Sequence, residues 1–135
     1  MNYIILVIED QPTNLKLALD LLVFEGHRVL QASDAEQALA ILDSTLPDLI
    51  LIDIALPGMD GLTLTRQLKS TPRTKNICIV ALTAFAMKGD QQKAFDAGCD
   101  GYITKPIDTR FFAAHVEKFI SGEPNKVLSG NRNNN

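Results

Sequence analysis

A short apolar run that ends in a charged residue is the feature that most constrains the fold of this chain. Leu49–Ile52 is uninterrupted and apolar, and Asp53 follows at once, before the breaking pair Pro57-Gly58. A run that is apolar on both faces is typical of a central parallel strand, which helices cover on both sides. A carboxylate at the carboxyl end of such a strand lies where open α/β sheets bind ligands. Asp53 is therefore either a capping residue or a reactive group.

The rest of the chain alternates between strand patterns and helix patterns. Further strands are predicted at Tyr3–Ile8, Arg28–Ala32, Ile77–Leu82 and Gly101–Thr104. Five strands alternating with five helices predict an α/β fold, a doubly wound parallel sheet with helices on both faces. One of the common orders of such sheets, 2-1-3-4-5, would place the first and third strands side by side, and we adopt it as the expectation. The helices are expected from Pro12 to Gly26, after a capping box at Ser33–Glu36, from Asp60 to about Ser70, from Met87 to Ala97, and from Asp108 to Ile120.

Composition narrows the class of protein. A chain of 135 residues with 46% hydrophobic and 21% charged residues is expected to form one globular domain. Its net charge of −3 argues against nucleic-acid partners and against an anionic membrane surface. No segment is long and apolar enough to span a bilayer, and the amino terminus has no basic leader, so a cytoplasmic location is expected.

Several polar residues outside the strand ends carry no chemical signal. Cys78 and Cys99 are expected to be unpaired thiols, because the chain has no CxxC motif. His27 and His115 lack the spacing of metal ligands and are expected at the surface.

From residue 121 to residue 135 the sequence becomes rich in Gly, Ser and Asn, which predicts a disordered tail after a domain of residues 1–120.

Polar residues also follow the other predicted strands at their carboxyl ends. Glu9-Asp10 ends the first strand, Thr83 the fourth and Lys105-Pro106 the fifth. The carboxyl ends of parallel strands meet at one rim, and the predicted order sets the first and third strands side by side. We therefore expect Glu9, Asp10 and Asp53 to share one pocket.

Three carboxylates in one pocket must protonate, move apart or bind a cation. Two of them at 4 Å repel by roughly 4 kcal/mol at an effective dielectric constant of 20. Oxygen ligands without Cys or His favour Mg²⁺, which retains water and leaves room for a phosphate oxygen. With Lys105 and the Thr83 hydroxyl nearby, the set suits phosphoryl transfer with Asp53 as nucleophile.

These motifs together resemble one known family. Glu9-Asp10, Asp53 within Ile52–Gly61, Leu82-Thr83-Ala84 and Tyr102–Pro106 are similar in order and position to the CheY-like receiver domains of response regulators. The resemblance covers about residues 3–120, and Thr83–Asp90 further resembles single-domain regulators of the DivK type. It implies a flavodoxin-like (βα)5 sandwich and a signalling domain of two-component phosphorelays that is not an enzyme in its own right.

The resemblance also implies a role for each matching residue. Asp53 would accept a phosphoryl group from a histidine kinase or a histidine phosphotransferase. Mg²⁺ would be held by the carboxylates of Asp10 and Asp53 and the carbonyl of Ala55, with Glu9 acting through water. The remaining implied roles are phosphoryl binding by Thr83, Ala84 and Lys105, conformational switching by Thr83 and Tyr102, and a cis Lys105-Pro106 peptide bond.

Partners are implied in the same way. A downstream protein would bind the face formed by the fourth helix, the fifth strand and the fifth helix, and a homodimer is compatible with the resemblance. In the first helix, Leu15, Leu19 and Val23 match positions that are usually polar, so the stripe is interpreted as a docking face for the phosphodonor. Leu17, Leu21 and Phe24 would then face the sheet.

Two positions beside the predicted site lack a polar side chain. Ala55 and Phe85 could not position an attacking water, which predicts slow self-hydrolysis of the phosphorylated form.

Two rival functions are considered beside the resemblance. The first is an aspartyl-nucleophile phosphohydrolase, although such enzymes typically have a second acid two residues after the nucleophile, where this chain has Ala55. A flavin carrier is the second, although Glu9–Pro12 lacks the glycines of a phosphate loop.

Overall fold

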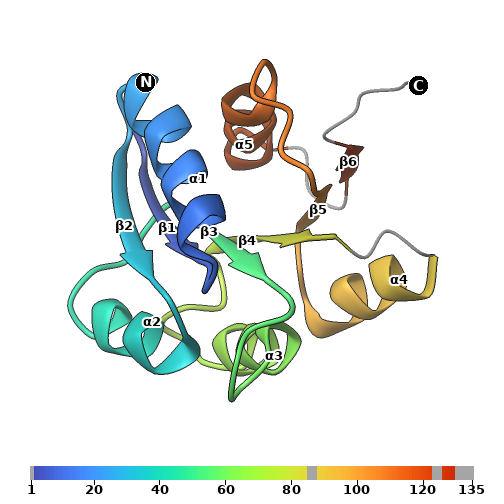
Figure 1. The fold of residues 1–135 in the computed structure, drawn as a ribbon. Helices are drawn as coiled ribbons and strands as arrows, with labels where there is room; N and C mark the ends of the chain where they lie inside the picture. The colour runs from blue at the N-terminus through green and yellow to red at the C-terminus, as the bar shows by residue number, and fades with distance from the viewer. Residues whose placement is uncertain (1, 85–87, 123–125, 130–135) are drawn as a thin grey trace.

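The computed structural model describes residues 2–84, 88–122 and 126–129, and Figure 1 shows their arrangement. One parallel sheet is flanked by helices on both faces (Figure 1). The strands are β1 (Ile4–Ile8), β2 (Arg28–Ala32), β3 (Leu49–Asp53), β4 (Cys78–Thr83), β5 (Gly101–Thr104) and β6 (Lys126–Ser129). The helices are α1 (Pro12–Phe24), α2 (Ala35–Leu42), α3 (Gly61–Lys69), α4 (Lys88–Ala97) and α5 (Phe112–Ile120).

The strand order confirms the predicted fold and adds one element to it. The order is β2-β1-β3-β4-β5-β6, and all neighbouring strands are parallel. The first five strands therefore have the predicted order 2-1-3-4-5. Within the tail that was expected to be disordered, Lys126–Ser129 pair with β5 as a sixth strand. Backbone pairing along an open sheet edge supplies the order that the polar composition of the tail does not suggest.

Two apolar clusters lie on opposite faces of the sheet. Strand side chains alternate between the faces, so Leu6 and Ile8 join one cluster while Ile5 and Val7 join the other. The first cluster contains buried residues of α2, α3 and α4, and the second contains those of α1 and α5. Helices α2, α3 and α4 therefore cover one face of the sheet, and α1 and α5 cover the other.

Helix caps show where local sequence signals were correct. Asp60 begins α3 as predicted, since its Oδ1 accepts a hydrogen bond from the backbone N–H of Thr63 at 2.8 Å. The cap of α2 is Asp34, whose Oδ1 accepts from Gln37, so the predicted capping box is shifted by one residue. The prediction that Asp108 caps α5 is wrong, because its side chain accepts from the backbone and guanidinium of Arg110.

Met87, predicted to begin the fourth helix, lies outside the described residues. Within the ranges that the structure describes, no helix has the length and apolar character needed to cross a membrane.

Candidate functional site

The parallel register brings the ends of β1 and β3 together. Ile8 pairs with Ile52, so the residues that follow each of them, Glu9 and Asp53, leave neighbouring strands at the same level. On the other side of β3, Asp53 itself pairs with Leu82 of β4. Three strand ends therefore converge on Asp53, as the predicted strand order requires.

Lys105 arrives at the same rim from the next strand. It follows Thr104, which pairs with Thr83, and its backbone N–H donates to the carbonyl oxygen of Thr83 at 2.8 Å. The Lys105 ammonium lies 3.0 Å from Asp53 Oδ2 and 2.8 Å from Glu9 Oε1. The peptide bond between Lys105 and Pro106 is cis, as the resemblance implies.

Backbone N–H groups hold the two buried carboxylates in place. Asp53 Oδ1 accepts a hydrogen bond from the backbone of Ala55 at 2.9 Å, and Glu9 Oε2 accepts one from the backbone of Gln11 at 3.1 Å. Both carboxylates are almost completely buried, at 1% exposure for Glu9 and 6% for Asp53. The structure therefore fixes their orientation and excludes most of the water that would otherwise solvate their charge.

Burial and mutual repulsion alter the protonation of the site. Desolvation raises the pKa of the Glu9 carboxyl, and the neighbouring Asp53 raises it further, against the lowering effect of Lys105. Burial disfavours the charged form of Lys105, but its contacts with Glu9 and Asp53 outweigh this effect and raise the pKa of the ammonium. Lys105 is therefore held as a cation at neutral pH, facing acids whose charge it compensates incompletely.

The acidic residues have the geometry and chemistry of a divalent-cation site. One carboxylate oxygen from each of Glu9, Asp10 and Asp53 lies within 4.8 Å of the other two. The predicted pocket is therefore present, and this donor set of oxygens alone fits a hard cation such as Mg²⁺. Ala55, whose carbonyl was expected to join the set, is exposed immediately above the strand end.

The residues expected to respond to phosphorylation are also at this rim. Thr83 is 1% exposed at the end of β4, and Ala84 is exposed directly after it. Tyr102 is fully buried and belongs to the apolar cluster under α2, α3 and α4. Its aromatic ring therefore occupies the interior of this structure. Phe85, whose side chain was predicted to be unable to position an attacking water, lies outside the described residues.

Helix α1 places its apolar residues differently from the prediction. Ala18 and Leu22 are buried, Leu15 packs partly against the core, and Phe24, expected to face the sheet, is 86% exposed. The predicted core-facing side is therefore wrong at Phe24 but not at Leu21, which packs partly against the core. The family register led to this prediction, whereas the larger apolar side of the helix, with Ala18 and Leu22, is the one that is buried. Of the predicted docking stripe, Leu19 is half-buried and Val23 is 56% exposed.

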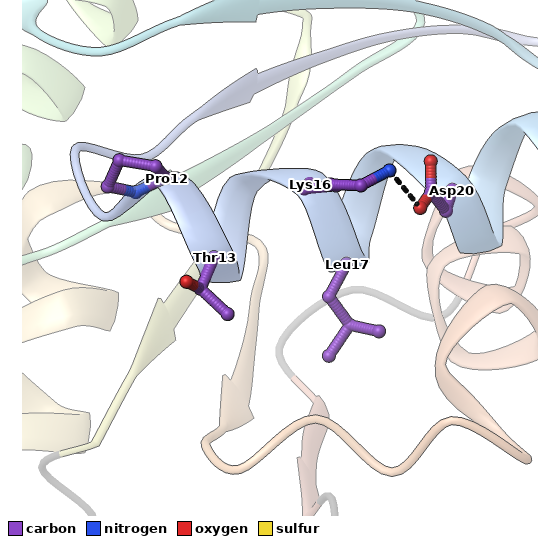
Figure 2. A pocket seen from close by; sticks show the side chains of 5 residues that line it. All are labelled: Pro12, Thr13, Lys16, Leu17 and Asp20. Atoms are coloured by element: carbon purple, nitrogen blue, oxygen red, sulfur yellow. Dashed lines mark hydrogen bonds and ion pairs between the residues drawn. The ribbon is translucent and has the colours of Figure 1, made fainter.

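An open groove of about 410 Å³ runs along the outer side of α1. Figure 2 shows its lining side chains, among them Lys16 and Asp20, whose charged ends are 2.9 Å apart. Pro12, where α1 begins, follows directly after the acidic segment at the end of β1. The groove is therefore a second surface near the rim, distinct from the predicted stripe. It is lined by Pro12, Thr13, Lys16, Leu17 and Asp20.

Gly61 is a residue of the site region to which the sequence analysis gave no role. A Cβ atom at this position would lie 2.4 Å from the carbonyl oxygen of Asp53, so no other residue fits here without movement of the backbone. The Gly61 N–H donates to the carbonyl oxygen of Ile54 at 2.9 Å. Gly61 thereby lets the start of α3 pack directly against the end of β3, and its place after Asp60 in the family motif is the signal for that role.

Comparisons with known proteins agree with this geometry. The family model for the response regulator receiver domain matches residues 5–117. The polar-differentiation response regulator DivK of Brucella ovis is 36% identical over 120 residues, which cover 89% of this chain and 98% of that protein.

Two solved structures are similar over most of their length. The receiver domain of a signal transduction histidine kinase from Syntrophus aciditrophicus is 33% identical with a TM-score of 0.81, over 89% of this chain and 91% of that one. The receiver domain of a sensor histidine kinase from Pseudomonas aeruginosa is 30% identical with a TM-score of 0.82, over 90% and 100%, and has a magnesium ion coordinated in its active-site cleft. The present chain belongs to the response regulator receiver domain family, the signalling domains of two-component systems.

Proposed function

We propose that this chain is a single-domain response regulator, formed by residues 1–120, that accepts a phosphoryl group on Asp53. The observation that carries the proposal is the contact of the buried Asp53 carboxylate with Lys105 inside an acidic cluster whose other members are Glu9 and Asp10. The relatives named DivK support the single-domain interpretation, because the match to the Brucella ovis protein covers 98% of its length. The phosphodonor in this proposal is a phosphohistidine of a histidine kinase or of a histidine phosphotransferase.

In the proposed transfer, one oxygen of Asp53 attacks phosphorus while the bond from phosphorus to the donor's histidine nitrogen breaks. The backbone N–H of Ala55 holds Asp53 Oδ1, which orients the carboxylate before the donor arrives. The Lys105 ammonium lies 3.0 Å from Asp53 Oδ2. It is therefore close enough to form an ion pair with the phosphoryl oxygens once Asp53 carries the phosphoryl group. The product is an acyl phosphate on Asp53 and a neutral histidine on the donor.

Mg²⁺ is part of the proposal because the acidic residues fit it. Glu9 through water, Asp10, Asp53 and the carbonyl of Ala55 would hold the ion. When bound, it would offset the repulsion between the carboxylates and the incoming phosphoryl group. The magnesium ion in the cleft of the Pseudomonas aeruginosa receiver domain supports this assignment.

The same proposal assigns the response to Thr83 and Tyr102. The Thr83 hydroxyl and the backbone after it at Ala84 would bind phosphoryl oxygens, drawing the loop before α4 towards Asp53. The buried position of Tyr102 in this structure matches the inward state of such a switch. A downstream protein would then bind the face of α4, β5 and α5, where it would contact or displace β6 at the outer edge of β5. Homodimer formation is also compatible with the proposal.

The phosphodonor is proposed to dock beside α1, at a surface that includes Leu19, Val23 and the groove of Figure 2. Leu15 contributes less than predicted, because it packs partly against the core. The proposal also includes a cytoplasmic location without nucleic-acid or membrane partners. It further includes slow self-hydrolysis of the phosphorylated form, because the side chains of Ala55 and Phe85 cannot position water.

Labelling by acetyl phosphate tests the acceptor assignment. Native protein should acquire a hydroxylamine-labile label only with Mg²⁺, and Asp53→Asn should reduce the label to background, because an amide cannot form the acyl phosphate. Asp60→Asn is the matched control: it makes the same change in charge, and Asn is an equally good N-cap, so labelling should persist. A full label in Asp53→Asn, measured by intact-protein mass, would place the acceptor elsewhere.

A further inference from the structure

Strand β6 occupies the outer edge of β5. Its four residues pair in register and in parallel, from Lys126 opposite Gly101 to Ser129 opposite Thr104. Thr104 immediately precedes Lys105, so the pairing ends one residue before the lysine that contacts Asp53. An edge strand offers a row of backbone N–H and C=O groups to any extended segment, and here the chain's own tail takes them.

The connection from β5 to β6 has the opposite hand to the other crossovers. The chain passes from β3 to β4 and from β4 to β5 over the face covered by α3 and α4. It continues in the same direction from β5 to β6, but α5 lies on the other face with α1. Because the other crossovers have the usual right hand, this one is left-handed, a form seen in about 2% of such connections.

The hand of this connection bears on how firmly β6 is held. Its tether gives β6 an effective concentration in the millimolar range over a free segment. The left hand acts against this advantage, because a right-twisted strand that feeds a right-handed helix packs back onto its sheet with the opposite hand. With four residues, β6 is also shorter than a typical strand of five or six. An untethered segment has no crossover to make, so it can compete for the same edge.

We propose that the outer edge of β5 is a binding site for an extended peptide that adds to the sheet as a parallel strand. Its resident ligand is the chain's own Lys126–Ser129, held in cis and exchangeable with the same segment supplied in trans. Recognition is through backbone hydrogen bonds to Gly101–Thr104, the general chemistry of strand addition. No step of this proposal depends on phosphoryl transfer.

A disulfide tests whether β6 occupies the edge in cis. Thr104 and Ser129 are register partners, and the spacing of neighbouring strands, about 4.8 Å, lies within the Cα range that a disulfide spans. Thr104→Cys with Ser129→Cys, in a full chain carrying Cys78→Ser and Cys99→Ser, should form an intramolecular disulfide. Thr104→Cys with Leu128→Cys is the control, one register off and on the opposite strand face, and should oxidise at least 10-fold more slowly.

The same variant tests whether the occupant is exchangeable. A fluorescent peptide with the sequence of residues 121–135 should bind the reduced protein and lose at least 10-fold in affinity when the disulfide locks β6 in place, measured by anisotropy. Val127→Pro with Leu128→Pro should bind the peptide more tightly than native protein. Neighbouring N–H groups alternate in direction, so this double variant removes whichever of the two donates to β5.

Four results would overturn the proposal. Failure of the register-matched pair to oxidise faster than its control would show that β6 does not occupy the edge. Covalent dimers in place of the intramolecular disulfide would show that the occupant comes from a second copy. Equal peptide binding by the locked and reduced proteins would place the peptide elsewhere. Absence of binding to the double-proline variant at millimolar peptide would show that the edge binds no free strand.

Discussion

The acids at the two ends of the sheet have different surroundings. At the carboxyl end, the buried carboxylates of Glu9 and Asp53 share the ammonium of Lys105, and a carboxylate oxygen of Asp10 lies within 4.8 Å of both, so the acids outnumber the cation. At the amino end, two acids each contact a side chain of their own. Asp100 pairs with Lys69 at 2.8 Å and accepts from the backbone of Ile79, and Glu117 contacts His27 at 2.7 Å.

This difference separates the residues that stabilise the fold from those prepared for a ligand. A buried charge costs free energy unless it is paired and hydrogen-bonded, and the amino end meets that condition. The carboxyl end does not, because its acids outnumber the lysine. The free energy stored in that imbalance becomes available to a cation or to a group that neutralises the cluster. Mutations at the two ends should therefore change stability in opposite directions.

Removing Asp100 is expected to have the largest effect on stability. Asp100→Ala leaves the Lys69 ammonium, 19% exposed, without its carboxylate partner, with only the carbonyl oxygens of Lys75 and Ile77 as acceptors. It also leaves the Ile79 N–H without its acceptor. The free energy of unfolding should fall by about 2–3 kcal/mol, measured by urea denaturation. Asp100→Asn keeps an acceptor for Ile79 and should cost about half as much. Equal stability of all three proteins would contradict the structural role of the amino end.

At the carboxyl end, Glu9→Gln should act in the opposite direction. The amide removes one charge from the crowded cluster and keeps an acceptor for the backbone of Gln11. In EDTA the variant should be more stable than native protein by up to about 1 kcal/mol. Added Mg²⁺ should raise the melting temperature of native protein more than that of the variant. A destabilised variant would mean that the ion pair with Lys105 outweighs the repulsion.

The cysteines of the amino end are expected to show the smallest response. Burial, with a smaller contribution from nearby Asp100, raises the pKa of Cys78 to about 12 and that of Cys99 to about 11. Since the thiolate is the reactive form, alkylation of native protein at pH 8 should be at least 100-fold slower than in urea. The rate should rise with pH far into the alkaline range. Rapid modification of the folded protein would show that this end opens locally.

The fold and the centre of the site could be predicted because both depend on strand ends. Continuous apolar runs identify the strands, and a parallel order with the first and third strands adjacent is enough to set Glu9, Asp10 and Asp53 at one rim, where they lie. Lys105 was assigned by its place after the fifth strand, and it lies within 3.0 Å of Asp53. Such signals can be read from the sequence because they depend only on the period of the apolar pattern and the direction of the strands.

Features that depend on tertiary packing were not predictable in this way. His27 was expected at the surface, yet its side chain is fully buried, stacked on Tyr3 and bonded to Glu117 of α5. No local pattern announces a contact between residues so distant in the sequence. The side of α1 that faces the core was also hard to predict, because the helix has apolar residues on two sides and either side could pack against the sheet. Strand β6 lies in a segment of mostly polar composition, and its pairing with β5 follows from the backbone of a strand edge, which no local pattern indicates.

The ion pair between Glu9 and Lys105 joins residues from near the two limits of the receiver fold. During synthesis, the first acid of the cluster leaves the ribosome long before the lysine that balances it. The reactive centre therefore cannot be completed until the last strand of the predicted sheet has been made and placed beside its neighbours. A chain that stops early, or folds only in part, would have the acids of the site without Lys105. Only a completely folded chain would therefore be able to carry a signal.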